Sequence, residues 1–228
     1  MIKAEGVGAK HTRHSAADVL AAALRILDQY GLADLTMRRL AAALDVQPSA
    51  LYWHFANKQT LLAAIADQIV ARANILHGDQ MASGADWIAS TRHECNALRD
   101  ALLAFRDGAE VVSSTLALGL GAGEAHKRLS AALATGGFEP NICTNAAAAM
   151  LHFILGHVSH EQQRMQADSL GVVAEEPAAT APATPTFARA PAPAPAHSHD
   201  AFDFGITLLV TGLHHGARTE KLTPHGLL

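Results

Sequence analysis

Three consecutive residues, Tyr52, Trp53 and His54, bring a hydroxyl, an indole N–H and an imidazole to one point of the chain. These groups can hydrogen-bond to phosphates and to the edges of bases in a major groove. A soluble helix rarely leaves such side chains together at its tip unless they contact another molecule. The cluster therefore predicts a surface that recognises double-stranded DNA. The alternative is an ordinary helical hairpin in which the aromatic rings fold onto the next helix.

Two short helices and a tight turn must position this cluster. Thr36 can cap the first helix, in which Leu40 and Leu44 recur at helical spacing. Asp45 interrupts this pattern. Pro48 suits the first turn of the second helix, because the N–H that proline lacks would have had no partner there. The pattern therefore predicts a helix-turn-helix.

Residues 15–74 resemble the DNA-binding domain of the tetracycline-repressor (TetR) family of bacterial transcription regulators. The matching stretches are residues 22–27, Tyr30-Gly31, Leu35-Thr36-Met37-Arg38-Arg39-Leu40-Ala41, and Leu51-Tyr52-Trp53-His54-Phe55 followed by Asn57-Lys58. The resemblance implies that the helix with Tyr52-Trp53-His54 enters the major groove and that Arg38 supplies another contact. The DNA-contacting residues expected on this basis are Thr36, Arg38, Gln47, Pro48, Ser49, Ala50, Tyr52, Trp53, His54 and Lys58.

Length and composition favour a globular protein of two compact domains or one large one. The chain has 228 residues, of which 50% are hydrophobic and 17% are charged, so it can bury a substantial core. We see no run of about 18 apolar residues that would span a membrane, and no N-terminal signal segment. We therefore expect a cytoplasmic protein with no membrane partner. Cys95 and Cys143 are expected to be buried free thiols, with a redox switch as the alternative.

Charge is distributed unevenly along the chain. Residues 1–72 hold eight Lys or Arg and six Asp or Glu, a balance of +2, whereas the remainder holds nine basic and fifteen acidic residues, a balance of −6. The net charge of −4 therefore does not exclude nucleic acid as a partner of the N-terminal part. Because the basic excess there is slight, DNA binding should depend on a few well-placed contacts and on dimerisation.

Periodicity and composition divide the chain into three parts. Residues 1–14 are expected to form a flexible arm, residues 15–75 a three-helix helix-turn-helix DNA-binding domain, and residues 76–228 a helical regulatory and dimerisation domain. Within the last part, residues 174–199 contain ten Ala and six Pro, which favours a disordered loop. No segment alternates in the way a strand would, so the predicted fold class is all-α.

The C-terminal part resembles, more thinly, the regulatory domain of the tetracycline-repressor subgroup. The similar stretches are Arg106-Asp107-Gly108-Ala109 with Val111, Gly137-Phe138, and residues 152–156. The resemblance implies that helices at residues 145–166 and 202–215 form a four-helix interface with a second copy. The broad apolar surfaces of both segments favour a homodimer independently.

Several residues depart from the pattern of proteins that bind tetracycline. In those proteins the helix that follows the stretch matching Arg106-Asp107-Gly108 moves, and a histidine on it binds the drug's Mg²⁺. The matching residue here is Val112, which has no lone pair to offer. Asn74, Glu94 and Leu98 stand where the family has His, Asn and Phe, whereas Thr115 is retained. We therefore predict that Mg-tetracycline is not the effector, and that the effector is a small, mainly apolar molecule.

Apolar side chains from several helical segments are candidates to line the effector pocket. The predicted lining is Trp87, Leu98, Leu102, Phe105, Val112, Thr115, Leu116, Leu133, Met150 and Phe153. The alternative is that these residues pack against one another as core. The protein would then be a dimeric DNA-binding or partner-docking protein without a small-molecule inducer.

Metal binding and catalysis have weaker support in the sequence. His157, His160 and Glu161 share a helical face and could join His214-His215 around zinc across a dimer, although helical His pairs are usually solvated or packed. The glycines of residues 119–123 follow no predicted strand and lack a Lys-Ser/Thr pair, which argues against a phosphate-binding loop. We therefore expect no cofactor, no metal site and no enzymatic activity.

Overall fold

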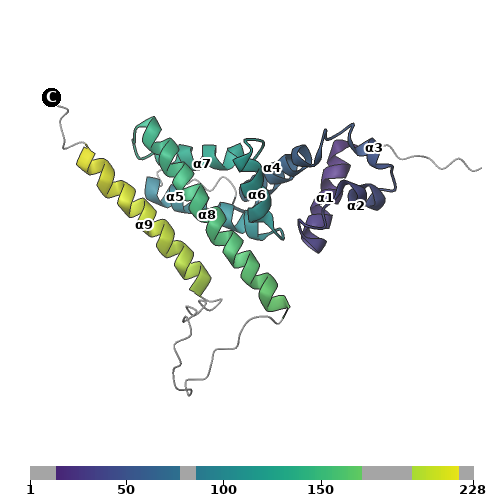
Figure 1. Ribbon diagram of the computed structural model, residues 1–228. Coiled ribbons are helices and arrows are strands. Elements are labelled where there is room, and N and C mark those ends of the chain that lie inside the picture. The colour runs from purple at the N-terminus through teal and green to yellow at the C-terminus, as the bar shows by residue number, and fades with distance from the viewer. Residues whose placement is uncertain (1–13, 78–85, 171–196, 221–228) are drawn as a thin grey trace, which may run out of the picture.

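Helices make up the described part of the chain (Figure 1). The computed structural model describes residues 14–77, 86–170 and 197–220, and no strand occurs in these ranges. The helices are α1 (Ala16–Tyr30), α2 (Met37–Ala43), α3 (Pro48–Leu51), α4 (Lys58–His77), α5 (Trp87–Leu103), α6 (Gly108–Ala117), α7 (Gly123–Ala134), α8 (Pro140–Ser169) and α9 (His197–Glu220). The predicted all-α class is confirmed.

Side-chain caps fix the ends of the N-terminal helices. The Ser15 hydroxyl accepts a hydrogen bond from the Asp18 N–H at 3.2 Å, and the Asp18 carboxylate accepts one from the Ser15 N–H at 2.8 Å. Gly31 ends α1 with a φ of 83°, a conformation that favours glycine. The Thr36 hydroxyl caps α2 by accepting from the Arg39 N–H at 3.1 Å. We call the unit formed by α1, α2 and α3 the reader.

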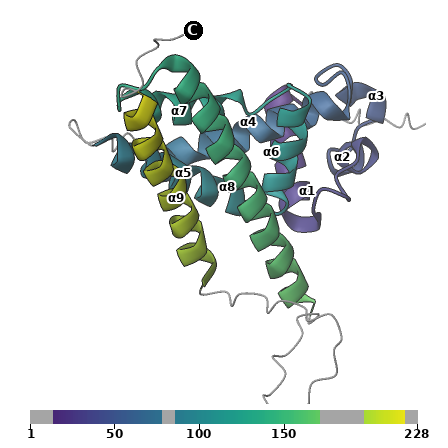
Figure 2. The ribbon, with the colours of Figure 1, turned by 60° about the vertical axis from the view of Figure 1, so that its left-hand side comes forward.

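Helix α4 connects the reader to the remaining helices. Asn57 precedes it, and its side-chain oxygen accepts a hydrogen bond from the Thr60 N–H at 2.9 Å. Beyond this cap, α4 packs against α1 on one side and against α5, α6 and α7 on the other. Figure 2 shows α4 running from the reader into the middle of the C-terminal helices. The buried side chains Leu61, Ile65 and Ile69 place α4 in the same hydrophobic core as both groups of helices.

The loop between α6 and α7 is attached to α4 at two points. Ala122 has a φ of 61°, and its N–H donates a hydrogen bond to the Asp67 carboxylate on α4 at 2.8 Å. A Cβ on Gly121 would lie 2.9 Å from the Ala63 carbonyl oxygen, so the loop backbone lies directly on α4. A Cβ on Gly119, by contrast, would meet nothing within 4 Å.

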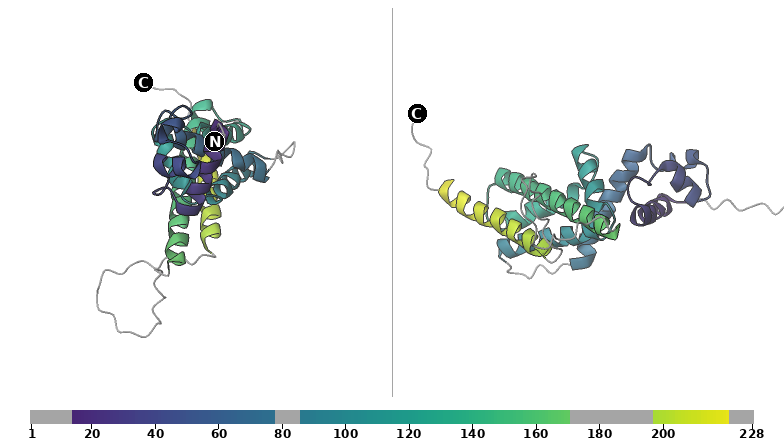
Figure 3. Two further views of the ribbon diagram at one scale, coloured as in Figure 1. Left: turned by 90° about the vertical axis from the view of Figure 1, so that its right-hand side faces the viewer. Right: turned by 60° about the horizontal axis from the view of Figure 1, so that its bottom comes forward.

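Helices α8 and α9 extend together beyond the other helices (Figure 3). The sequence predicted a loop through residue 199, but α9 begins at His197, so the last three residues of that loop are helical. A tertiary contact accounts for the difference, because the Arg99 guanidinium of α5 lies 3.4 Å from the His199 ring. Residues 171–196, the rest of the predicted loop, and residues 1–13 of the predicted arm lie outside the described residues.

A buried ion pair ties α5 to α8. Both carboxylate oxygens of Glu161 accept hydrogen bonds from Nη2 of Arg99, at 2.7 and 2.9 Å. The Arg99 guanidinium carbon also lies 5.3 Å from the centre of the Phe202 ring, so the same side chain contacts α9. Arg99 therefore joins three helices, α5, α8 and α9.

By length and composition, α8 meets the criteria for a helix that could cross a membrane. It has 30 residues, and its apolar 18-residue window has a mean hydropathy of 1.3, so the prediction that no such segment exists is wrong. Such a criterion is also met by core helices of soluble proteins. The buried side of α8 packs against α5, α6, α7 and α9, which accounts for its apolar composition.

Candidate nucleic-acid interface and regulatory core

The aromatic cluster lies at the surface of the reader. Helix α3 ends at Leu51, which is buried, and Tyr52, Trp53 and His54 occupy the turn that follows. Trp53 is 89% exposed and Tyr52 is 51% exposed, and His54 is also exposed. The alternative in which the Trp53 ring folds onto the next helix is therefore excluded in this structure. An indole N–H and a phenol hydroxyl are left available to another molecule.

The other residues expected to contact DNA lie on or beside α2 and α3, or at the start of α4. Arg38, Gln47, Pro48 and Ser49 are exposed, and so is Thr36, whose hydroxyl is engaged in capping α2. Ala50 and Lys58 are half-buried, Ala50 in α3 and Lys58 at the start of α4.

Arg39, the neighbour of Arg38, is held by contacts within the reader. Its guanidinium forms an ion pair with Asp34 and lies 3.8 Å from the centre of the Tyr30 ring. These contacts orient Arg39 along the surface of α1 and α2, whereas the exposed Arg38 has no ion-pair partner in the described part of the chain. Arg39 is therefore a structural residue of the reader, whereas Arg38 is a candidate DNA contact.

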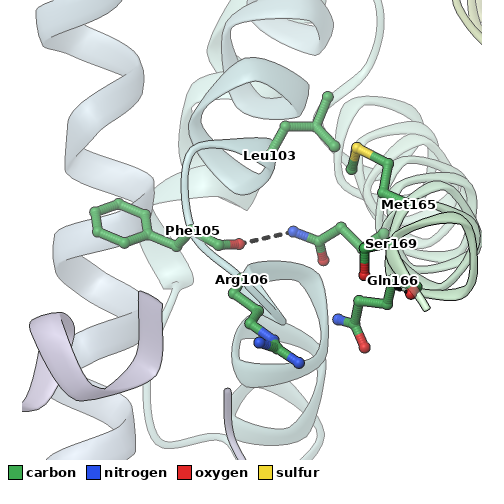
Figure 4. Close-up of a pocket in the computed structure, with 7 residues that line it drawn as sticks. Leu103, Phe105, Arg106, Met165, Gln166 and Ser169 are labelled. Atoms are coloured by element: carbon green, nitrogen blue, oxygen red, sulfur yellow. Dashed lines mark hydrogen bonds between the residues drawn. The ribbon is translucent and has the colours of Figure 1, made fainter. Parts of the chain in front are cut away.

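The residues predicted to line the effector pocket come together in the C-terminal domain. Leu98, Leu102, Val112, Thr115, Leu133 and Met150 are buried, and Trp87, Phe105, Leu116 and Phe153 are half-buried. All of the apolar ones belong to, or pack against, one hydrophobic core. The cavity drawn in Figure 4 shares only Phe105 with this group. The effector pocket therefore stays a prediction.

The polar groups of this region have partners within the protein. The Thr115 hydroxyl donates to carbonyl oxygens of its own helix, with Val111 O at 3.0 Å and Val112 O at 3.1 Å. Glu94 forms an ion pair with Arg128 of α7 at 2.5 Å, and both side chains are mostly buried. At the two positions where the tetracycline responders place a metal-binding histidine and an asparagine, this chain therefore has a buried valine and an ion-paired carboxylate.

Neither cysteine has the properties of a reactive thiol. Burial raises the pKa of the Cys95 thiol to about 12, and burial also raises the pKa of Cys143. Both are free thiols and both are buried, as the sequence indicated.

Within the described ranges, no group of three His, Cys, Asp or Glu side chains has the geometry of a metal site. The His157 ring instead packs against Phe153 and Phe202, with centroid distances of 5.7 and 5.4 Å. His214 stacks on Trp87 at 6.1 Å. These histidines therefore take part in packing between helices.

Asp107, in the turn between α5 and α6, has a role that sequence reasoning did not find. It has a φ of 56°, and its carboxylate accepts a hydrogen bond from the Leu32 N–H of the reader at 2.8 Å. Its other oxygen accepts from the Gln166 side chain of α8 at 2.5 Å. The turn was recognisable from Arg106-Asp107-Gly108, but no local signal indicates partners 75 and 59 residues away.

Comparison with known proteins assigns both parts of the chain. The family described as "Bacterial regulatory proteins, tetR family" matches residues 19–65, and "Tetracyclin repressor-like, C-terminal domain" matches residues 82–216. The tetracycline repressor protein class A from transposon 1721 of Escherichia coli is 35% identical over 199 residues, which cover 86% of this chain and 88% of the relative.

Solved structures agree with this assignment. BioQ of Mycobacterium smegmatis is 39% identical, with a TM-score of 0.71 over 88% of this chain and 97% of that one. A second structure, BioQ with its natural double-stranded DNA operator, is 38% identical with a TM-score of 0.67 over 88% of this chain and 98% of that one. The relatives compared are regulators of transcription. The chain belongs to the TetR family of transcription regulators, which bind DNA operators through the helix-turn-helix of the N-terminal domain.

Proposed function

We propose that the protein is a homodimeric repressor of the bacterial cytoplasm that binds a palindromic operator and is released by a small, mainly apolar effector other than Mg-tetracycline. The observation that carries the DNA-binding part is the exposed aromatic cluster, with Trp53 89% and Tyr52 51% exposed. The DNA-bound structure of a relative supports the same role. In a dimer, two readers would bind half-sites about 34–36 Å apart, one turn of the double helix.

Exposed apolar residues on α9 support the dimer. Phe204 is 64% exposed and Leu208 is 58% exposed, and Thr211 continues the same stripe at helical spacing. Helix α8 exposes His152 and Gly156 on its own outer surface. Large apolar side chains in such a stripe are usually covered by a partner. Replacing Phe204 by Glu should convert the dimer to a monomer in light scattering, and a persistent dimer would refute this interface.

The packing of the C-terminal domain supports a route from effector to reader. An effector that separates α5, α6 and α8 would shift α6, and the loop after α6 is attached to α4 through Asp67 and Ala63. Movement of α4 would alter the separation of the two readers. A coupling free energy of about 1–3 kcal/mol is typical of such regulators.

The second candidate is a dimeric regulator or docking protein without an inducer. It is favoured by the tight packing of the predicted pocket residues, of which Leu102, Val112 and Leu133 are completely buried. Addition of small molecules to the operator complex distinguishes the inducible repressor from the regulator without an inducer. Release of DNA by any member of a broad library of apolar metabolites and antibiotics supports the inducible repressor, and retention of DNA throughout supports the alternative.

Selection of bound duplexes from a randomised pool tests the DNA-binding function directly. The purified full-length protein is incubated with the pool at low salt, and the bound fraction is sequenced over several rounds. We expect a two-fold symmetric motif, because two identical readers related by a dimer axis must contact equivalent half-sites. A folded dimer that enriches no sequence would refute the proposal.

A further inference from the structure

A small pocket lies between the end of α5, the turn that follows it and the last turns of α8 (Figure 4). Its volume is about 220 Å³, below the roughly 300–1,000 Å³ of sites for drug-sized ligands. The pocket shares only Phe105 with the predicted effector region, so it is a separate site. Its size indicates a ligand smaller than a drug-sized molecule.

The two ends of the pocket differ in chemistry. Leu103 and Met165 form an apolar end, and Met165 is 49% exposed although it is a large apolar side chain. The exposed guanidinium of Arg106 lies at the other end beside Gln166 (Figure 4). Arg106 forms no ion pair with any carboxylate in the described ranges. A cation that lacks a partner next to an apolar surface suits an anion with an apolar tail.

The floor of the pocket is already saturated with hydrogen bonds. The Gln162 side chain donates to Leu102 O at 3.0 Å and Phe105 O at 2.8 Å, and accepts from the Ala109 N–H at 3.2 Å. This buried amide holds the turn between α5 and α6 in place. A ligand therefore has Arg106 as its charged partner, while the amide of Gln162 shapes the cavity without competing for that ligand.

The same turn contacts the reader. A Cβ on Gly31 would lie 3.2 Å from Nε of Arg106 and 2.7 Å from the Asp107 carboxylate, which accepts the hydrogen bond from Leu32. Gln166, a lining residue, donates to the other oxygen of Asp107. A molecule that draws Arg106 or Gln166 into the pocket must therefore disturb the contact between the turn and the reader.

We propose that this pocket binds a small organic carboxylate with a short apolar tail, and that its occupation changes the affinity of the reader for DNA. The carboxylate pairs with Arg106 and the tail lies between Leu103 and Met165. The site is a second input to the reader, distinct from the effector region of the core.

Titration calorimetry of the full-length protein with octanoate tests the binding step. We expect saturable binding, no comparable binding of octylamine, and about a tenfold weaker affinity in Arg106→Gln. Met165→Ser should also weaken octanoate binding, because it removes the apolar wall. Arg25→Gln, which removes another exposed cation, from α1, is the matched control and should leave the affinity unchanged. Equal octanoate binding by the wild type and Arg106→Gln would overturn the site, as would absence of binding to the wild type.

Operator affinity tests the coupling step. Saturating octanoate should change the dissociation constant of the wild-type operator complex by at least about fivefold and that of Arg106→Gln by much less. Thermal unfolding of each variant checks that it is folded. Octanoate binding at Arg106 with no change in operator affinity would refute the coupling while leaving the DNA-binding function intact.

Discussion

Replacement of Trp53 by alanine tests the DNA-contacting surface most directly. Because Trp53 is 89% exposed, the substitution removes little packing from the free protein. The free energy of unfolding should change by no more than about 0.5 kcal/mol. A loss of operator affinity in this variant would therefore report a lost contact with DNA, since the fold is left intact.

The size of the effect can be worked from the exposed surface. A tryptophan side chain offers roughly 200 Å², so about 180 Å² of Trp53 is available for burial. At about 25 cal/mol per Å², complete burial would contribute at most about 4.5 kcal/mol. Ordering of the side chain and incomplete contact reduce this value, so we expect a loss of about 1–3 kcal/mol for each reader.

Fluorescence anisotropy with a labelled selected operator gives the affinity, and urea unfolding of the same samples gives the stability. Leu170→Ala is a matched control, because Leu170 is also a large apolar residue, 76% exposed, but lies at the end of α8. Its operator affinity should equal that of the wild type. If Trp53→Ala binds the operator as tightly as Leu170→Ala does, the assignment of the DNA-contacting surface is wrong.

Three further substitutions test other parts of the structure. Lys58→Ala should reduce the magnitude of the negative slope of log affinity against log salt by about one, because one phosphate contact is lost. An unchanged slope would exclude that contact. Glu161→Ala should lower the free energy of unfolding in urea by about 2–3 kcal/mol, because the buried Arg99 loses its two short hydrogen bonds and, among the described carboxylates, keeps only that of Asp100 at 3.8 Å; a wild-type midpoint would contradict this. Gly205→Ala should lower the stability measured by calorimetry by about 1–3 kcal/mol, because the added Cβ would overlap the Phe153 ring; an unchanged Tm would contradict this.

Features decided by neighbours in the chain could be predicted from the sequence. Thr36 caps its helix as expected, because a capping side chain bonds to an N–H two or three residues away. Pro48 lies in the first turn of α3, also as expected, because the N–H that proline lacks needs no partner there. The exposed aromatic cluster followed from the same short-range pattern.

Features decided by distant residues could not be predicted. Asp107 stood out only as part of a stretch similar to the family, and its bonds to Leu32 and Gln166 depend on how distant elements of the chain meet. The first turn of α9 belonged to the predicted disordered loop, whereas in the structure His199 contacts Arg99 of α5 and pairs with Asp203 one turn along α9. For the predicted pocket, the sequence gives the apolar character of each residue, whereas the space between the side chains depends on the packing of every neighbouring helix.

The two attachments of the α6–α7 loop to α4 restrict where this chain can accept extra residues. Surface loops usually tolerate insertions, and a tag or a reporter domain is commonly placed in one. Here an insertion at Gly121 or Ala122 would break the contact with Ala63 and the hydrogen bond to Asp67. An insertion at Gly119 would meet open space. Gly119 is therefore a permissive site for a fusion. An insertion only two residues further along, at Gly121, would detach the loop from α4, the helix that leads to the reader.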